Sequence, residues 1–256
     1  MSENPYAAPQ AVVTDAVVPR SDGDFRDDPR AVSAGNGWQW IVSAWTLFKQ
    51  APAMWMVVVL IVMGISMVLG MVPFLGPLAQ NLAWPFMFGA IALFADDVYK
   101  GRTADVAVFG NITAHTAPLL VLGLIYLGGI VALLAVAFVP ILGLSGLGFF
   151  AGSSPELAFD KRIWIGFLIY FVLAIPFMMS TYFAPILVVL QGKAPLDALR
   201  LSLRAGVRNI LPMIVFMLGL MALGLLATLP LLLGWFVLIP VMFATSYASY
   251  RDIFFD

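Results

Sequence analysis

Short amphipathic segments alternate with long apolar runs along this chain, and the first such unit is the stretch 37–55. Its apolar side chains recur at helical spacing and form one stripe, while Gln39, Ser43, Thr46 and Lys49 take other faces. Tryptophan suits the headgroup layer of a membrane, so we expect this helix to lie on the membrane surface. The alternative is an amphipathic helix packed on protein, without a role toward lipid. The stripe consists of Trp38, Ile41, Val42, Trp45 and Phe48.

Six long apolar runs lie between the polar segments. A membrane-spanning helix needs about 20 predominantly apolar residues, and each run comes close to that length. The pattern therefore predicts an all-α, polytopic membrane protein with six transmembrane helices. The stretch 118–151 is too long for one span and too short for two, so we expect its Gly-rich piece 140–152 to be re-entrant or interfacial. The expected spans cover about 54–72, 78–95, 118–139, 163–190, 210–229 and 235–250.

The segment 194–208 is the most strongly charged amphipathic helix that the pattern predicts. Arg200, Arg204 and Arg208 recur every four residues beside an apolar stripe. Such a pair of rows is typical of a helix that rests on an anionic leaflet, with its guanidinium groups reaching the phosphates. The alternative is a cationic loop helix that only fixes the topology. A weaker surface helix is expected over 103–113. The apolar stripe consists of Leu196, Leu199, Leu203 and Val207.

Lysine and arginine are distributed unevenly between the two sides of the predicted membrane domain. With the N-terminus inside and six spans, eleven of the thirteen Lys and Arg residues lie in inner segments, and only Lys161 and Arg162 lie outside. Cytoplasmic loops carry the excess of basic residues in membrane proteins. We therefore expect both termini to be cytoplasmic.

Prolines recur at matching places and indicate an internal threefold repeat. One proline opens each odd-numbered span, and a second proline, followed two positions later by methionine, lies in each even-numbered span. We interpret the chain as a disordered cytoplasmic tail, 1–36, and a transmembrane domain, 37–256, of three parallel modules at about 37–102, 103–193 and 194–256. The entry prolines are Pro52, Pro118 and Pro212, and the exit prolines are Pro85, Pro176 and Pro240.

Composition supports the assignment as a membrane protein and argues against most kinds of catalytic site. The chain is 62% hydrophobic and 11% charged, with a mean hydropathy of +0.99, whereas soluble domains are about half apolar and a quarter charged. It has no cysteine and one histidine, His115, so thiolate chemistry and a histidine-based metal site are not expected. The net charge of −1 argues against a nucleic-acid partner. We expect no enzymatic activity, no cofactor and no metal.

Within the expected spans, hydroxyl side chains form two clusters, which follow Pro176 and Pro240. Behind a proline, a hydroxyl can bond backbone carbonyls, and we take this as their main role. The alternative is that they line a cavity between modules in a small-solute or lipid transporter. The acidic pair Asp96 and Asp97 is interpreted as a solvated helix end. The four candidate cavity residues are Thr181, Tyr182, Thr245 and Tyr247.

Three segments resemble an uncharacterised family of bacterial integral inner-membrane proteins. They are the NPYxxP tail, the GWxWIxxxWxLFxxxPxxW opening and the PLDALRLSLRAGVRN helix. The alternation of amphipathic helices with hairpins also resembles, distantly, the membrane domain of some glycerophosphodiester phosphodiesterases, but no phosphodiesterase domain is present, so that activity is not carried over. The resemblance implies a multi-pass protein of the bacterial inner membrane and supplies no catalytic residue.

These features favour a non-enzymatic accessory protein that binds membrane lipids, with anionic headgroups as the expected ligand. A protein partner recruited through Asn4-Pro5-Tyr6 in the tail is a second expectation. The transporter described above is the alternative function. The expected headgroup residues are Arg200, Arg204, Arg208, Trp38, Trp45 and Lys49.

Overall fold

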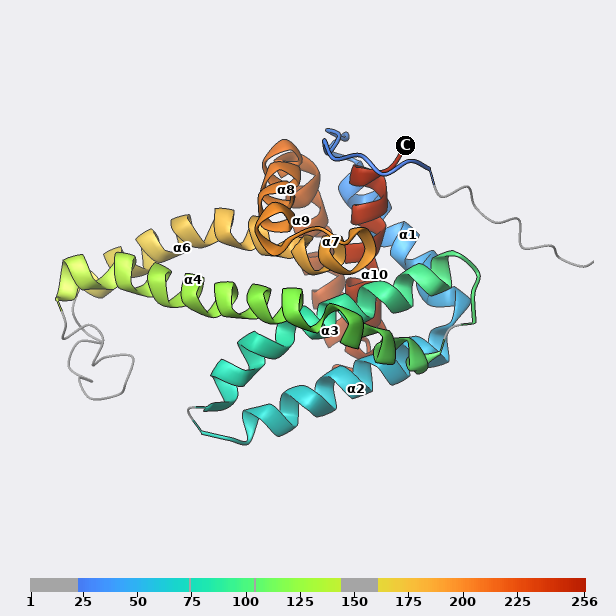
Figure 1. The fold of residues 1–256 in the computed structure, drawn as a ribbon, viewed down its shortest axis with the longest axis horizontal. Coiled ribbons are helices and arrows are strands. Elements are labelled where there is room, and N and C mark those ends of the chain that lie inside the picture. Colours follow the sequence, from blue (N-terminus) through green and yellow to red (C-terminus); the bar gives the residue numbers. More distant parts are fainter. Residues whose placement is uncertain (1–22, 74, 104, 144–160) are drawn as a thin grey trace, which may run out of the picture.

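The computed structural model describes residues 23–73, 75–103, 105–143 and 161–256 (Figure 1). Within these residues the chain is helical, and its extended backbone pairs only at an isolated bridge between Phe25 and Phe255. Five helical segments are long and apolar enough to cross a membrane. The prediction of an all-α membrane protein is therefore confirmed at this level. The five segments are Pro52–Gly70, Leu75–Tyr99, Phe109–Leu142, Lys161–Gln191 and Ile210–Thr228.

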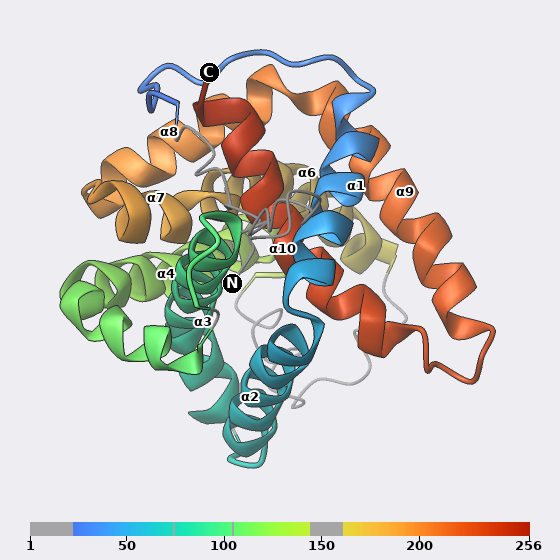
Figure 2. The same cartoon turned by 90° about the vertical axis from the view of Figure 1, so that its right-hand side faces the viewer.

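The apolar runs form three helical hairpins, and the three hairpins spread apart from one another toward their tips (Figures 1 and 2). They are α2–α3, α4–α6 and α9–α10, and α7 continues α6 after a break. Near the tips, large apolar side chains such as Met67, Leu168 and Leu229 are exposed. Water tolerates such a surface poorly, whereas lipid covers it without cost. The bounds are α1 Asn36–Gln50, α2 Pro52–Gly70, α3 Leu75–Tyr99, η1 Val106–His115, α4 Thr116–Leu142, α6 Lys161–Tyr182, α7 Ala184–Gln191, α8 Pro195–Arg208, α9 Ile210–Thr228 and α10 Trp235–Phe254.

The segments that follow the three exit prolines meet in the main core. Phe94 of α3, Phe183 and Leu187 at α7, and Tyr247 and Phe254 of α10 are all fully or almost fully buried there. All three exit prolines lie inside helices, Pro85 in α3, Pro176 in α6 and Pro240 in α10. After Pro176 the chain breaks at Phe183, and Pro185 lies in the first turn of α7. Each hairpin thus contributes the second half of its second leg to one shared core.

Each surface segment packs mainly against a hairpin other than the one that follows it in the chain, in cyclic order. The helix α1 lies along α9 and α10, η1 lies on α3, and α8 lies on α6 and α7. The close approach of α1 to α9 requires glycine, because a Cβ at Gly37 would lie 2.0 Å from the carbonyl oxygen of Pro212. The hairpins are therefore interlocked, and α1 connects the first hairpin to the third.

Residues 23–35 form an ordered arm, so the prediction of a disordered tail up to residue 36 is wrong for this part. The arm runs past the C-terminus from α1 to α8 (Figure 2). Its backbone bonds the end of α10, with Arg26 N donating to Phe254 O (2.8 Å) and Arg30 N to Ile253 O (3.1 Å), while the Phe25 ring stacks on Phe254. The composition of the arm is polar because its partners are charged groups at the far end of the chain. Residues 1–22, including the expected docking peptide, lie outside the described residues.

Three further boundaries differ from expectation. The helix α4 continues through Pro140 to Leu142, so the first residues of the expected re-entrant piece are helical; 144–152 lie outside the described residues. The weak surface helix is a 3₁₀ helix, η1, with Asp105 as its N-cap. The expected sixth span corresponds to α10, which is not among the five apolar candidates because its C-terminal half is polar and buried in the core.

Candidate functional site

The helix α8 presents three faces, and the one that packs on the chain consists mainly of small residues. Ala198, Ser202, Ala205 and Gly206 are buried, and the helix packs on α6 and α7. Ser202 lies where α6 breaks: its hydroxyl donates to Met179 O (2.6 Å) and accepts from Phe183 N (3.0 Å). The small side chains allow close approach, and Ser202 satisfies the backbone at the break. This packing fixes which side of α8 faces outward.

Of the predicted apolar stripe of α8, Leu196 and Val207 are turned away from the chain, whereas Leu199 packs against the main core. Leu196 is 57% and Val207 is 55% exposed, and Leu199 and Leu203 are half-buried. A stripe made to pack on the hairpins would be buried instead. The outward stripe lies next to the arginine row, so apolar and cationic side chains share one open surface.

The arginine row divides into two parts. Arg200 and Arg204 are exposed, and Arg200 makes a loose, exposed pair with Asp197 (Nη1 to Oδ1, 3.6 Å), which contributes little. Arg208 instead holds the arm: its Nη1 donates to Asp28 Oδ1 (2.6 Å) and to Pro29 O (2.7 Å). The structure therefore keeps Arg200 and Arg204 as the outward cations and gives Arg208 a structural role.

The junction between α8 and α9 is the second anchor of the arm. Asn209 is fully buried; its Oδ1 accepts from Val32 N (2.9 Å), and its Nδ2 donates to Arg30 O (3.0 Å) and Ala205 O (2.9 Å). Before α8, Lys193 pairs with Asp27. The arm thus binds residues at both ends of α8 and stabilises the position of this helix on α6 and α7.

We expect the docking of the arm to depend on acid pH. The hydrogen bond from Arg208 holds the pKa of the Asp28 carboxyl below its usual range. Because the folded-state pKa is lowered, the contribution of this carboxyl is complete above its unfolded pKa of about 3.9 and is lost as the pH falls through the lower folded value. Hydrogen exchange of the Arg26, Arg30 and Val32 amides, corrected for intrinsic rate, should accelerate in that range. In Asp28→Asn, the acceleration of exchange that comes from protonation of Asp28 should be absent. If the exchange rates of this variant depend on pH as those of the unmodified chain do, Asp28 does not control the docking of the arm.

The expected headgroup residues of α1 lie apart from the arginine row in the fold. Trp38 is 46% and Trp45 is 43% exposed, and Lys49 lies exposed in the last turn of α1. On its other side α1 buries Trp40, Ala44 and Leu47 and the stripe residues Ile41 and Phe48. The helix therefore packs on protein with one face and exposes two tryptophans on another. Because α1 packs on α9 and α10 whereas α8 packs on α6 and α7, the six expected headgroup residues form two separate surfaces.

Two of the four candidate cavity hydroxyls bond the backbone of their own helices. Thr181 donates to Met178 O (3.1 Å) and Thr245 to Val241 O (2.7 Å), so these hydroxyls do bond backbone carbonyls. Both carbonyls come after the proline in the sequence, whereas the carbonyls that a proline leaves without a donor come before it. Tyr182 Oη is buried and has no hydrogen-bond partner of normal geometry among the described residues. Of the four residues, only Tyr247 lines either of the two pockets described here, a polar cleft between α1, α3 and α10.

Two acidic residues act as acceptors that sequence reasoning missed. Asp96, only 8% exposed, accepts from Tyr247 Oη (2.8 Å) and from Arg102 Nη2 (2.7 Å). The prediction of a solvated pair is therefore wrong for Asp96. Asp252 accepts from Arg30 Nη2, Asn36 Nδ2 and Trp40 Nε1 at 2.7–2.8 Å. Except for Arg102, these donors lie far away in the sequence, so no local pattern indicates their contacts.

No protein-family model matches this chain, and comparison with curated proteins and with solved structures finds no match either. The function therefore has to be inferred from the surfaces described above.

Proposed function

We propose that this chain is a non-enzymatic accessory protein of the bacterial inner membrane that binds anionic lipid headgroups on the outward surface of α8. Its membrane domain has six spans in three parallel modules, with both ends of the chain in the cytoplasm. A protein partner recruited through residues 1–22 remains a prediction beside this proposal.

The arrangement of α10 supports a sixth span. It is the second leg of a hairpin, as α3 and α6 are, and its first half, from Trp235 to Ala244, is apolar. Its polar second half is enclosed by protein and not by lipid, which is where a membrane helix tolerates such residues. With six spans, the three surface segments fall on the side that carries most lysines and arginines.

The cyclic packing supports the three-module interpretation. Each surface segment rests chiefly on the second leg of the hairpin that precedes it, with α1 resting on the last hairpin. A chain with three equivalent modules around an axis along the membrane normal closes in this way.

The observation that carries the headgroup proposal is the open surface of α8, on which Leu196 and Val207 lie exposed beside Arg200 and Arg204. The opposite face is packed on protein, so this helix is already oriented. At a membrane surface the apolar side chains reach the acyl boundary, and the guanidinium groups meet lipid phosphates. Each basic residue near an anionic surface contributes about 1 kcal/mol.

The double variant Arg200→Gln/Arg204→Gln is expected to bind phosphatidylglycerol about 10–30-fold more weakly, as the loss of two such contributions implies. Native mass spectrometry of detergent-solubilised protein, titrated with phosphatidylglycerol, measures this affinity. The matched control is Lys161→Gln/Arg162→Gln, which removes the same charge at the start of α6. Equal affinities of the α8 variant and the unmodified chain would contradict the proposal.

A further inference from the structure

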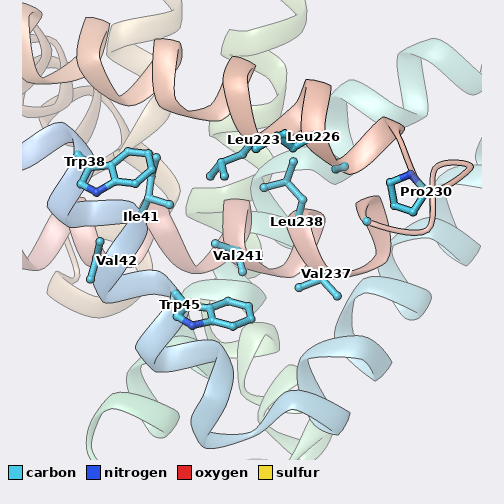
Figure 3. A pocket seen from close by; sticks show the side chains of 12 residues that line it. Trp38, Ile41, Val42, Trp45, Leu223, Leu226, Pro230, Val237, Leu238 and Val241 are labelled. Carbon is cyan, nitrogen blue, oxygen red and sulfur yellow. The ribbon is translucent and has the colours of Figure 1, made fainter.

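A groove lies between the two legs of the α9–α10 hairpin, and α1 closes one end of it (Figure 3). Its volume is about 490 Å³. Buried side chains, among them Ile41 and Val241, form the floor, and exposed side chains, among them Trp45 and Val237, form the rim. The groove continues along the hairpin to Pro230 at the tip.

The groove exists because α1 fills only part of the space between the legs. At its start α1 approaches α9 closely, at Gly37 and again at Gly219, where a Cβ would lie 2.9 Å from Ile41 Cδ1. The helix ends at Gln50, and Pro52 then begins α2. Beyond the part that Trp38, Ile41, Val42 and Trp45 line, the groove is bounded by α9, α10 and the turn between them (Figure 3).

The lining excludes water and favours hydrocarbon. All twelve lining residues are apolar or aromatic, and their only polar side-chain atoms are the indole nitrogens of Trp38 and Trp45. A bound water needs two to four polar partners. The volume corresponds to roughly 16 groups of about 30 Å³, the size of a water molecule and close to that of a methylene group. One extended acyl chain has about this size.

We propose that this groove binds one acyl chain of a bilayer phospholipid. The inference rests on the proposed position of α9 and α10 across the membrane, because the rim then opens sideways into the hydrocarbon layer. The exposed apolar face of α9, with Leu225 and Leu226, is continuous with the rim, so a chain enters from the bilayer without crossing a polar surface. The bound chain separates the legs of the hairpin where α1 no longer does so.

Tryptophan quenching by a phosphatidylcholine with brominated acyl chains tests the proposal, because Trp38 and Trp45 line the groove. Titrated into detergent-solubilised full-length protein, this probe is expected to quench part of the fluorescence saturably, at one lipid per chain. Val42→Phe/Val237→Phe fills the rim and should weaken the saturable phase at least tenfold. The matched control Val68→Phe/Val172→Phe adds the same bulk at exposed sites on α2 and α6 and should titrate like the unmodified chain.

Two further variants separate the possible outcomes. Trp235 also lies beside the groove, next to Gly224 and Gly234, so Trp38→Phe/Trp45→Phe/Trp235→Phe should abolish the saturable phase; if that phase persists, the lipid lies elsewhere and the proposal is overturned. The probe has no net charge, so Arg200→Gln/Arg204→Gln should leave its binding unchanged even where phosphatidylglycerol binding is lost. Quenching that rises linearly with lipid, or that saturates equally in Val42→Phe/Val237→Phe, shows ordinary solvation by lipid and also overturns the proposal.

Discussion

Replacing Gly37 with alanine is expected to lower the free energy of unfolding by about 2 kcal/mol. The new Cβ would lie 2.0 Å from Pro212 O and 2.7 Å from Phe216 N, and both atoms belong to the backbone of α9. Overpacking costs about 1–3 kcal/mol, and the upper end applies because backbone moves less readily than a side chain. The better helix propensity of alanine, about 1 kcal/mol, offsets part of the loss. The helix α1 then has to move away from α9.

Equilibrium unfolding in mixed micelles measures the effect, and Gly35→Ala is the matched control. Gly35 has right-handed helical dihedral angles (φ −63°), and a Cβ there meets nothing within 4 Å. The control is expected to differ from the unmodified chain by less than about 0.5 kcal/mol. Equal stabilities of the two variants would show that α1 does not pack on α9 as described.

Replacing Asp252 with alanine is expected to cost about 2–4 kcal/mol and to release the arm. One carboxylate accepts hydrogen bonds from Arg30, Asn36 and Trp40, which belong to the arm and to α1. Its side chain is 22% exposed, so the donors lose a largely buried partner. Removing one partner of a buried charged pair is strongly destabilising because the other groups stay unpaired.

Asp256→Ala is the control for this prediction. Asp256 pairs with Arg26 of the same arm at 2.8 Å, but both side chains are largely exposed, so this pair should contribute only about 0–1 kcal/mol. Unfolding in mixed micelles gives the stabilities, and protease sensitivity of the arm reports its release. If both aspartate variants lose the same stability, the Asp252 cluster does not anchor the arm.

The hairpins could be predicted from sequence because their signal is local. A long apolar run bounded by Pro and polar residues indicates a span by length alone, and α2 and α9 begin and end within two residues of the expected limits. The row of Arg200 and Arg204 could be found in the same way, since helical spacing places both on one side of α8. The separate role of Arg208, which binds the arm, could not be predicted from the sequence, because its partner Asp28 lies 180 residues away.

The arm and the interlocked packing of the hairpins could not be predicted from the sequence, for the same physical reason. A polar stretch rich in proline is typical of disorder when it is considered alone. Here its order depends on Lys193, Asn209 and Asp252, which only the fold brings together. The apolar stripe of α8 was predicted correctly as a stripe, but its outward direction depends on the small residues that pack beneath the helix.

Cysteine accessibility tests most directly the central claim, that the arm and the surface segments lie on one side of the membrane and the hairpin tips on the other. The chain has no cysteine of its own, so single replacements give an unambiguous signal. Cysteines are placed at exposed positions: Ala34, Thr103 and Asp197 for the inner side, and Met71, Lys161 and Leu229 for the tips. In spheroplasts, a membrane-impermeant maleimide is predicted to label only the three tip positions, and the other three only after permeabilisation. Labelling at Asp197 in intact spheroplasts would place α8 on the outer side and contradict the account.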